Sequence, residues 1–139
     1  MTTSLQIALS QKGPTRAEAR AAARLDEDSQ RTAVTAARAA LEKKADEVVV
    51  LDLRGVSGYT DFLVIGSGTS DRQLEAIAES VEKELTTQGH RVIGSEGQRG
   101  GRWVLLDFGD VVVHVFHADE RTHYDLEGLW ADAPRIEVE

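Results

Sequence analysis

Residues 61–89, DFLVIGSGTSDRQLEAIAESVEKELTTQG, decide the fold, because a short strand runs through a tight turn directly into an amphipathic helix. The run from Asp61 to Ile65 is short and mostly apolar, which is typical of a strand buried on both faces. The helix follows from Ser70, which forms a capping-box pattern with Gln73, and Gly89 supplies a stop. Its apolar residues recur at helical spacing: Leu74, Ile77, Ala78, Val81 and Leu85. We therefore predict a strand–turn–helix unit of an α/β domain.

Two further strands are predicted downstream, in the segment WVLLDFGDVVVHVF. Trp103–Phe108 and Asp110–Phe116 are separated by Gly109, a pattern typical of a tight antiparallel hairpin. Short strands are also expected at Val48–Leu53 and at Arg91–Ser95. With a helix before the first strand and another after the last, the pattern predicts an α/β domain with a mixed sheet of about five strands flanked by helices.

The two ends of the chain are less regular. Residues 1–28 are predicted to form an extension, and residues 29–139 a single domain. The Ala/Arg run in the extension favours helix but has almost no large apolar side chain, so it is interpreted as mobile or as a loosely docked helix. The first firm helix is expected to begin near Ser29, a good N-cap residue. A short helix is expected from Asp119 or Glu120 to Leu129, followed by an extended tail from Pro134.

Composition and charge exclude several classes of protein. The chain has 139 residues, 16 basic and 24 acidic, so its formal net charge is −8. It has no cysteine, which excludes disulfide scaffolds, thiolate metal sites and cysteine nucleophiles. Residues 96–139 hold four basic and ten acidic residues, so most of the imbalance lies there. This bias argues against a broad basic face for nucleic acid and is compatible with a basic partner or with a merely solvated acidic surface.

Three groups of residues could carry chemistry, and each has a simpler structural interpretation. Gly66–Asp71 could hold an anion at a helix N-terminus, but it matches no phosphate-loop motif and is better explained as a tight turn with a cap. His114 and His117 are three apart on a strand, which is a poor metal geometry. Asp107 and Asp110 could bind magnesium or transfer protons, but aspartates also suit the turn that they flank.

Three segments together resemble the ribosomal silencing factor family, RsfS, also called Iojap. They are LDLRGVSGYTDFLVIGSGTSDRQLEAIAESVE, EGQRGGRWVLLDFGDVVVHVF and ERTHYDLEGLWADAP, in the order and spacing of the family. The resemblance covers roughly Ser29 to Pro134. It implies a nucleotidyltransferase-like α/β fold without the catalytic residues, and therefore a protein that is not an enzyme and needs no cofactor or metal.

The resemblance also implies a function and a partner. Family members bind large-subunit ribosomal protein fourteen and sterically block association of the two ribosomal subunits, which represses translation in nutrient limitation. It further implies a cytoplasmic location, no membrane contact, little direct nucleic-acid contact and a homodimer when free. There are two alternative hypotheses: the protein acts in assembly of the large subunit, or it is a nucleotide-binding enzyme of the same fold.

The predicted binding site for the ribosomal protein has six residues. Four match positions at or near the family's binding surface: Trp103, Val104, Asp107 and Phe108. Glu96 and Tyr124 are added on charge and proximity in the pattern. We expect Trp103 to be a partly buried anchor and Asp107 to accept a charge-assisted hydrogen bond from a lysine or arginine.

Overall fold

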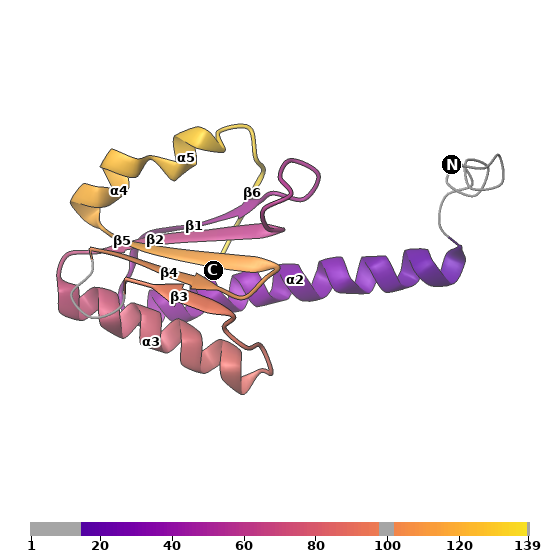
Figure 1. The fold of residues 1–139 in the computed structure, drawn as a ribbon, viewed down its shortest axis with the longest axis horizontal. Coiled ribbons are helices and arrows are strands. Elements are labelled where there is room, and N and C mark those ends of the chain that lie inside the picture. The colour runs from indigo at the N-terminus through magenta and orange to yellow at the C-terminus, as the bar shows by residue number, and fades with distance from the viewer. Residues whose placement is uncertain (1–14, 98–101, 139) are drawn as a thin grey trace, which may run out of the picture.

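The computed structural model describes residues 15–97 and 102–138 (Figure 1). The helices are α2 (Arg16–Glu42), α3 (Asp71–Thr87), α4 (Ala118–Tyr124) and α5 (Leu126–Leu129). The strands are β1 (Asp46–Asp52), β2 (Phe62–Gly68), β3 (Gly94–Glu96), β4 (Trp103–Asp107), β5 (Val111–His117) and β6 (Arg135–Ile136). None of the helices in these two ranges is long and apolar enough to cross a membrane.

The described residues form a six-stranded mixed sheet in the order β3-β4-β5-β2-β1-β6. The central strands β2 and β5 are parallel, and every other neighbouring pair is antiparallel. The mixed sheet and the hairpin of β4 and β5 are confirmed. The predicted count omitted β6, a two-residue strand in the tail after Pro134 that pairs Ile136 with Val50.

The two faces of the sheet are covered unequally. Helices α2 and α3 cover one face along its length, and α4 and α5 lie over part of the other (Figure 1). Helix α2 turns a row of small buried side chains to the domain, which lets it pack closely on the sheet and on α3: Ala33, Ala36, Ala37 and Ala40. The opposite face has its own apolar cluster, built on Leu51, Leu63, Ile65, Val112 and Phe116.

The first helix begins much earlier than expected. Helix α2 starts at Arg16, where the Thr15 side chain accepts from Glu18 N and Glu18 reaches back to Thr15 N in a capping box. The prediction of a start at Ser29 is therefore wrong. Ser29 is buried within the helix instead, and its hydroxyl donates to Asp110 Oδ2 at 3.2 Å. The Ala/Arg run extends a helix whose later part is already packed on the domain. Such an extension needs high helix propensity but no apolar face of its own.

Two other boundaries differ from the prediction. The strand expected at Arg91–Ser95 is found as β3, at Gly94–Glu96. The single C-terminal helix is broken into α4 and α5 at Asp125, which has a φ of 45°. The Asp125 carboxylate accepts from Gly128 N, so this residue ends one helix and caps the next.

Candidate functional site

Strand β4 presents alternate side chains to the two faces of the sheet. Val104 and Leu106 point into the core beneath α2 and α3 and are 0% exposed. Trp103, Leu105 and Asp107 are half-buried on the opposite face, which the short helices cover only in part (Figure 1). The structure therefore separates Val104 from Trp103, and the Val104 side chain does not reach a surface where a partner could touch it.

An aromatic cluster surrounds Trp103. Its indole stacks on Phe116 at 5.3 Å between ring centroids and on His114 at 5.6 Å. Tyr124, at the end of α4, lies 4.8 Å from Trp103 and is 47% exposed. These four rings form a continuous apolar surface whose outer members, Trp103 and Tyr124, remain accessible.

One hydrogen bond fixes the orientation of the indole. Trp103 Nε1 donates to His114 Nδ1 at 2.9 Å, and because an indole only donates, the proton of the neutral imidazole lies on Nε2. His114 is 4% exposed, and burial lowers its pKa from 6.5 to about 4. The imidazole is therefore neutral near pH 7 and holds Trp103 in one rotamer.

Acidic residues border this surface. Asp107 Oδ1 accepts from Gly109 N at 2.8 Å, which leaves most of the capacity of the carboxylate available. Glu96 is exposed on β3 opposite Leu105, and cross-strand partners share a face of the sheet. Burial raises the pKa of Tyr59, and the Asp107 carboxylate adds to that shift, so the β1–β2 connection brings Tyr59 close to the same border.

Four of the six predicted site residues therefore share one face: Trp103, Asp107, Glu96 and Tyr124. Phe108 packs instead against the core beneath α2 and α3, as Val104 does. The prediction omitted His114 and Phe116 from the site. Both could have been found from the hairpin register, which pairs Trp103 with Phe116 and Leu105 with His114.

A buried arginine holds the short helices on this face. Arg121 Nε donates to Glu127 Oε1 at 2.8 Å, and its Nη1 donates to Asp46 O and to Ser67 Oγ, each at 3.2 Å. Arg121 is 6% exposed, and its Nη2 makes no hydrogen bond. Because these bonds join α4 and α5 to β1 and β2, they position Tyr124 beside the indole.

The turn before α3 matches its structural interpretation. Ser70 Oγ accepts from Gln73 N at 3.1 Å, and Gln73 Oε1 accepts from Thr69 N at 2.8 Å. A capping box predicts that Gln73 accepts from the backbone N–H of the N-cap, Ser70, but here it accepts from the residue before, Thr69. A Cβ on Gly68 would lie 2.9 Å from Leu74 Cδ1, so any other residue there would force the buried Leu74 side chain to shift. Two of the amides in this turn, Thr69 N and Gln73 N, are thus bonded to the protein's own side chains.

The other candidate groups do not converge. His114 Nδ1 is occupied by Trp103, whereas His117 Nδ1 lies 3.2 Å from Arg102 Nη2. Asp107 bonds its own turn, and Asp110 accepts from α2. Within residues 15–97 and 102–138, no group of three or more histidine, aspartate or glutamate side chains could hold a metal ion.

The fold and the surface define a small α/β domain that exposes an aromatic, acid-bordered part of one sheet face. A family model described as ribosomal silencing factor during starvation matches residues 26–139. The chain belongs to this family.

Known relatives agree with this assignment. The chain is 50% identical over 98 residues to ribosomal silencing factor RsfS of Halalkalibacterium halodurans, covering 70% of this chain and 84% of that protein. A crystal structure of a Chromobacterium violaceum protein superposes with a TM-score of 0.71 at 37% identity, over 73% of this chain and 85% of that one. A mouse protein named mitochondrial assembly of ribosomal large subunit protein 1 is 34% identical over 92 residues, 64% of this chain and 40% of its own length.

Proposed function

We propose that this chain is a ribosomal silencing factor. It binds the large ribosomal subunit at ribosomal protein fourteen and sterically blocks joining of the small subunit, which represses translation when nutrients are limited. Membership of the family, with the half-buried Trp103 on the partly open face of the sheet, is the observation that carries the proposal. On this proposal the chain acts in the cytoplasm, where ribosomes are, and is a homodimer when free.

The geometry of the surface supports a protein partner. An indole that is already held by His114 and stacked on Phe116 loses little conformational freedom on binding, which favours a tight anchor. Asp107 and Glu96 lie on the border, where carboxylates match a basic surface such as that of a ribosomal protein. The aromatic anchor and the acidic border together fit a partner surface that has an apolar patch surrounded by lysine or arginine side chains.

The proposed role is steric and not catalytic. Asp107 and Asp110 flank one turn, yet their carboxylates accept hydrogen bonds from different elements: Asp107 from Gly109 N in the turn, and Asp110 from the Ser29 hydroxyl on α2. Their carboxylates are therefore used to hold the turn and to dock α2. Titration with nucleoside triphosphates and magnesium tests this: we expect no heat of binding, and saturable heat that disappears in Asp107→Asn would overturn it.

The proposal is tested by sedimentation of purified subunits in a sucrose gradient. Equimolar protein should convert the monosome peak into separate subunits, and the protein should travel with the large subunit. Trp103→Ala should restore the monosome peak, whereas Trp130→Ala is the matched control: Trp130 packs against the same apolar cluster, but among the described residues its ring stacks on none of the four. An unchanged monosome peak with the unmodified protein would refute the proposal.

A second function has its own support. The name of the mouse relative refers to assembly of the large ribosomal subunit. An assembly factor would use the same surface on the same ribosomal protein but earlier, on precursor particles. Deletion of the gene separates the two: accumulation of large-subunit precursors during growth indicates assembly, whereas normal subunits with failure to repress translation in starvation indicate silencing.

A further inference from the structure

Helix α2 carries an arginine stripe, defined here as Arg16, Arg20, Arg31 and Arg38. At 3.6 residues per turn these four positions fall within about 60° of one another around the helix axis. All four are exposed, and the side of the helix opposite them carries the buried alanines that pack on the domain. At 1.5 Å per residue the stripe is about 33 Å long. In the sequence, Arg24 continues the four-residue spacing of Arg16 and Arg20.

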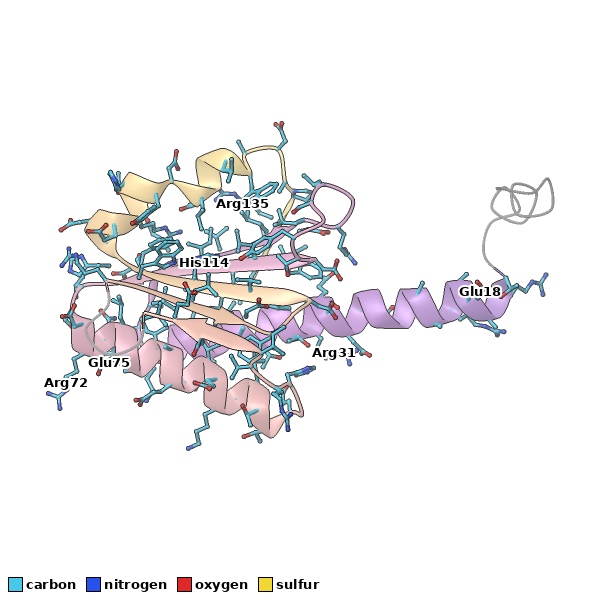
Figure 2. The ribbon with its side chains drawn as sticks, in the orientation of Figure 1. Glu18, Arg31, Arg72, Glu75, His114 and Arg135 are labelled. Atoms are coloured by element: carbon cyan, nitrogen blue, oxygen red, sulfur yellow. The ribbon has the colours of Figure 1, made fainter. Side chains whose placement is uncertain are left out.

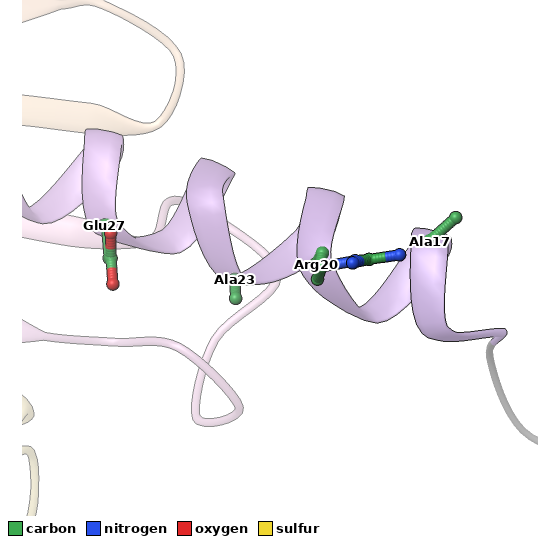
Figure 3. Close-up of a pocket in the computed structure, with 4 residues that line it drawn as sticks. All are labelled: Ala17, Arg20, Ala23 and Glu27. Carbon is green, nitrogen blue, oxygen red and sulfur yellow. The ribbon is translucent and has the colours of Figure 1, made fainter.

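The outer half of α2 extends past the sheet (Figure 1). The described side chains of residues 15–23 and 27–28 are exposed, and the helix first becomes buried at Ser29. Figure 3 shows this segment, with Arg20 between Ala17 and Ala23, and with Glu27 nearer the domain. A helix of this length that stands clear of its own domain can reach a second surface while Trp103 contacts the first.

The exposed outer segment is not basic as a whole, because residues 15–28 hold three arginines and four acidic residues, a net charge of −1. What distinguishes it is that its arginines fall on one side of the helix, whereas Glu18 and Asp26 fall on other sides. One acidic residue, Glu27, falls within the stripe, four residues before Arg31. The Arg31 guanidinium pairs with a different residue: its Nη1 lies 3.3 Å from Asp28 Oδ1, and both side chains are more than half exposed. An exposed pair of this kind contributes little and exchanges easily for another anion.

We propose that the arginine stripe of α2 contacts the phosphate backbone of large-subunit ribosomal RNA, in contrast to the expectation from the sequence of little direct nucleic-acid contact. Guanidinium groups in a row match a row of phosphates, because each can bind phosphate oxygens in a bidentate manner. A lipid surface fits less well, because a membrane-binding helix needs a free face of large apolar side chains beside its basic one. The apolar face of the inner half of α2 is buried in the domain, and the sequence of the outer half, residues 15–28, has one large apolar residue, Leu25. The inference rests on the proposed function for its choice of RNA.

The test compares two triple variants in which the same change is made three times. The stripe variant is Arg16→Gln, Arg20→Gln and Arg31→Gln, and the control is Arg72→Gln, Arg91→Gln and Arg135→Gln. The control arginines are exposed and lie on α3, after α3 and on β6, and Figure 2 shows Arg72 and Arg135 well away from Arg31. Glutamine retains helix propensity, so circular dichroism should show the same helix content in all three proteins.

Binding is measured against salt, on intact large subunits and on protein-free large-subunit RNA. On subunits, the plot of log affinity against log salt should be shallower by about 2 to 3 for the stripe variant, with affinity at least about tenfold lower at low salt. The control should stay within about twofold of the unmodified protein. On protein-free RNA at low salt, the unmodified protein should bind and the stripe variant should bind at least about tenfold more weakly.

Each other outcome has one meaning. Equal salt slopes for the unmodified protein and the stripe variant would overturn the inference. So would a loss on subunits if the unmodified protein does not bind protein-free RNA, because the stripe would then contact an acidic protein. Failure of the unmodified protein to bind subunits would refute the proposed function instead, while the RNA measurement would still report on the stripe.

Discussion

The two faces of strand β4 show how one short segment can serve stability and binding separately. Leu106 points into the core beneath α2 and α3, and its neighbour Leu105 is half-buried on the face that α4 and α5 leave partly open. On the closed face, beneath the two long helices α2 and α3, the side chains of β4 pack in an apolar core. On the open face, aromatic rings and carboxylates surround Trp103. The comparison suggests that substitutions on the closed face should change folding and those on the open face should change binding.

The largest expected effect tests this comparison on adjacent leucines. Leu106→Ala should lower the free energy of unfolding by about 2–5 kcal/mol, because it removes a fully buried side chain and leaves a cavity in the core. Leu105→Ala, the matched control, should cost about 1 kcal/mol because its side chain already meets solvent. Urea denaturation followed by circular dichroism measures both. Equal losses would show that the two faces are equally closed.

The next effect concerns affinity. Trp103→Ala should weaken binding to large subunits by about 2 kcal/mol, roughly thirtyfold in Kd, because it removes the outer ring of the cluster. Trp130→Ala should leave the Kd nearly unchanged, since that indole is outside the cluster of four rings. Titration of labelled protein with subunits gives both values. A Trp103 variant that binds within a factor of two of the unmodified protein would remove Trp103 from the binding site.

A third effect is a dependence of stability on pH. The pKa of His114 is about 4 in the folded protein, below its ordinary value of 6.5, because burial disfavours the charged imidazole. The unfolded chain therefore binds more protons below pH 6.5, and stability falls as the pH drops from 6.5 to about 4. Between pH 7 and pH 5 this histidine should account for a loss of about 2 kcal/mol.

The histidine is isolated by comparison with a variant. His114→Gln keeps an acceptor near Trp103 Nε1 but does not titrate, so its stability should fall less between pH 7 and pH 5 than that of the unmodified protein. Urea midpoints at the two pH values give the difference, and any constant destabilisation by the substitution cancels. Parallel pH profiles for the two proteins would show that His114 stays solvated.

Elements with a strong local pattern were predicted from the sequence, and elements that depend on distant pairing were not. The strand–turn–helix unit around Ser70 and the hairpin around Gly109 are found with boundaries close to those expected. Strand β6 has two residues and exists only because β1 offers it an unpaired edge, so no local pattern marks it. The break at Asp125 depends on a left-handed backbone conformation that most helix patterns do not reveal.

The candidate site was predicted in part, for a similar reason. Trp103, Asp107, Glu96 and Tyr124 are found on one face, but Val104 was included although adjacent residues of a strand point to opposite faces. Strict use of that alternation would have excluded it and included Leu105. The hydrogen bond from Trp103 to His114 joins residues eleven apart, and it becomes predictable only once the hairpin register is known.

The smallest effect tests the acidic border of the open face. Asp107→Asn removes the charge but retains an oxygen that can accept from Gly109 N, so the turn should survive and the protein should fold normally. Binding to large subunits should weaken by about 1 kcal/mol, roughly fivefold in Kd, with a smaller dependence on salt, if Asp107 pairs with a basic group of the partner. Asp110→Asn is the matched control, because its carboxylate accepts from Ser29 on α2 and not from the open face. An equal loss in both variants would mean that the general negative field of the domain attracts the partner and that Asp107 makes no specific contact, whereas a loss confined to Asp107→Asn would place the basic group beside the aromatic cluster.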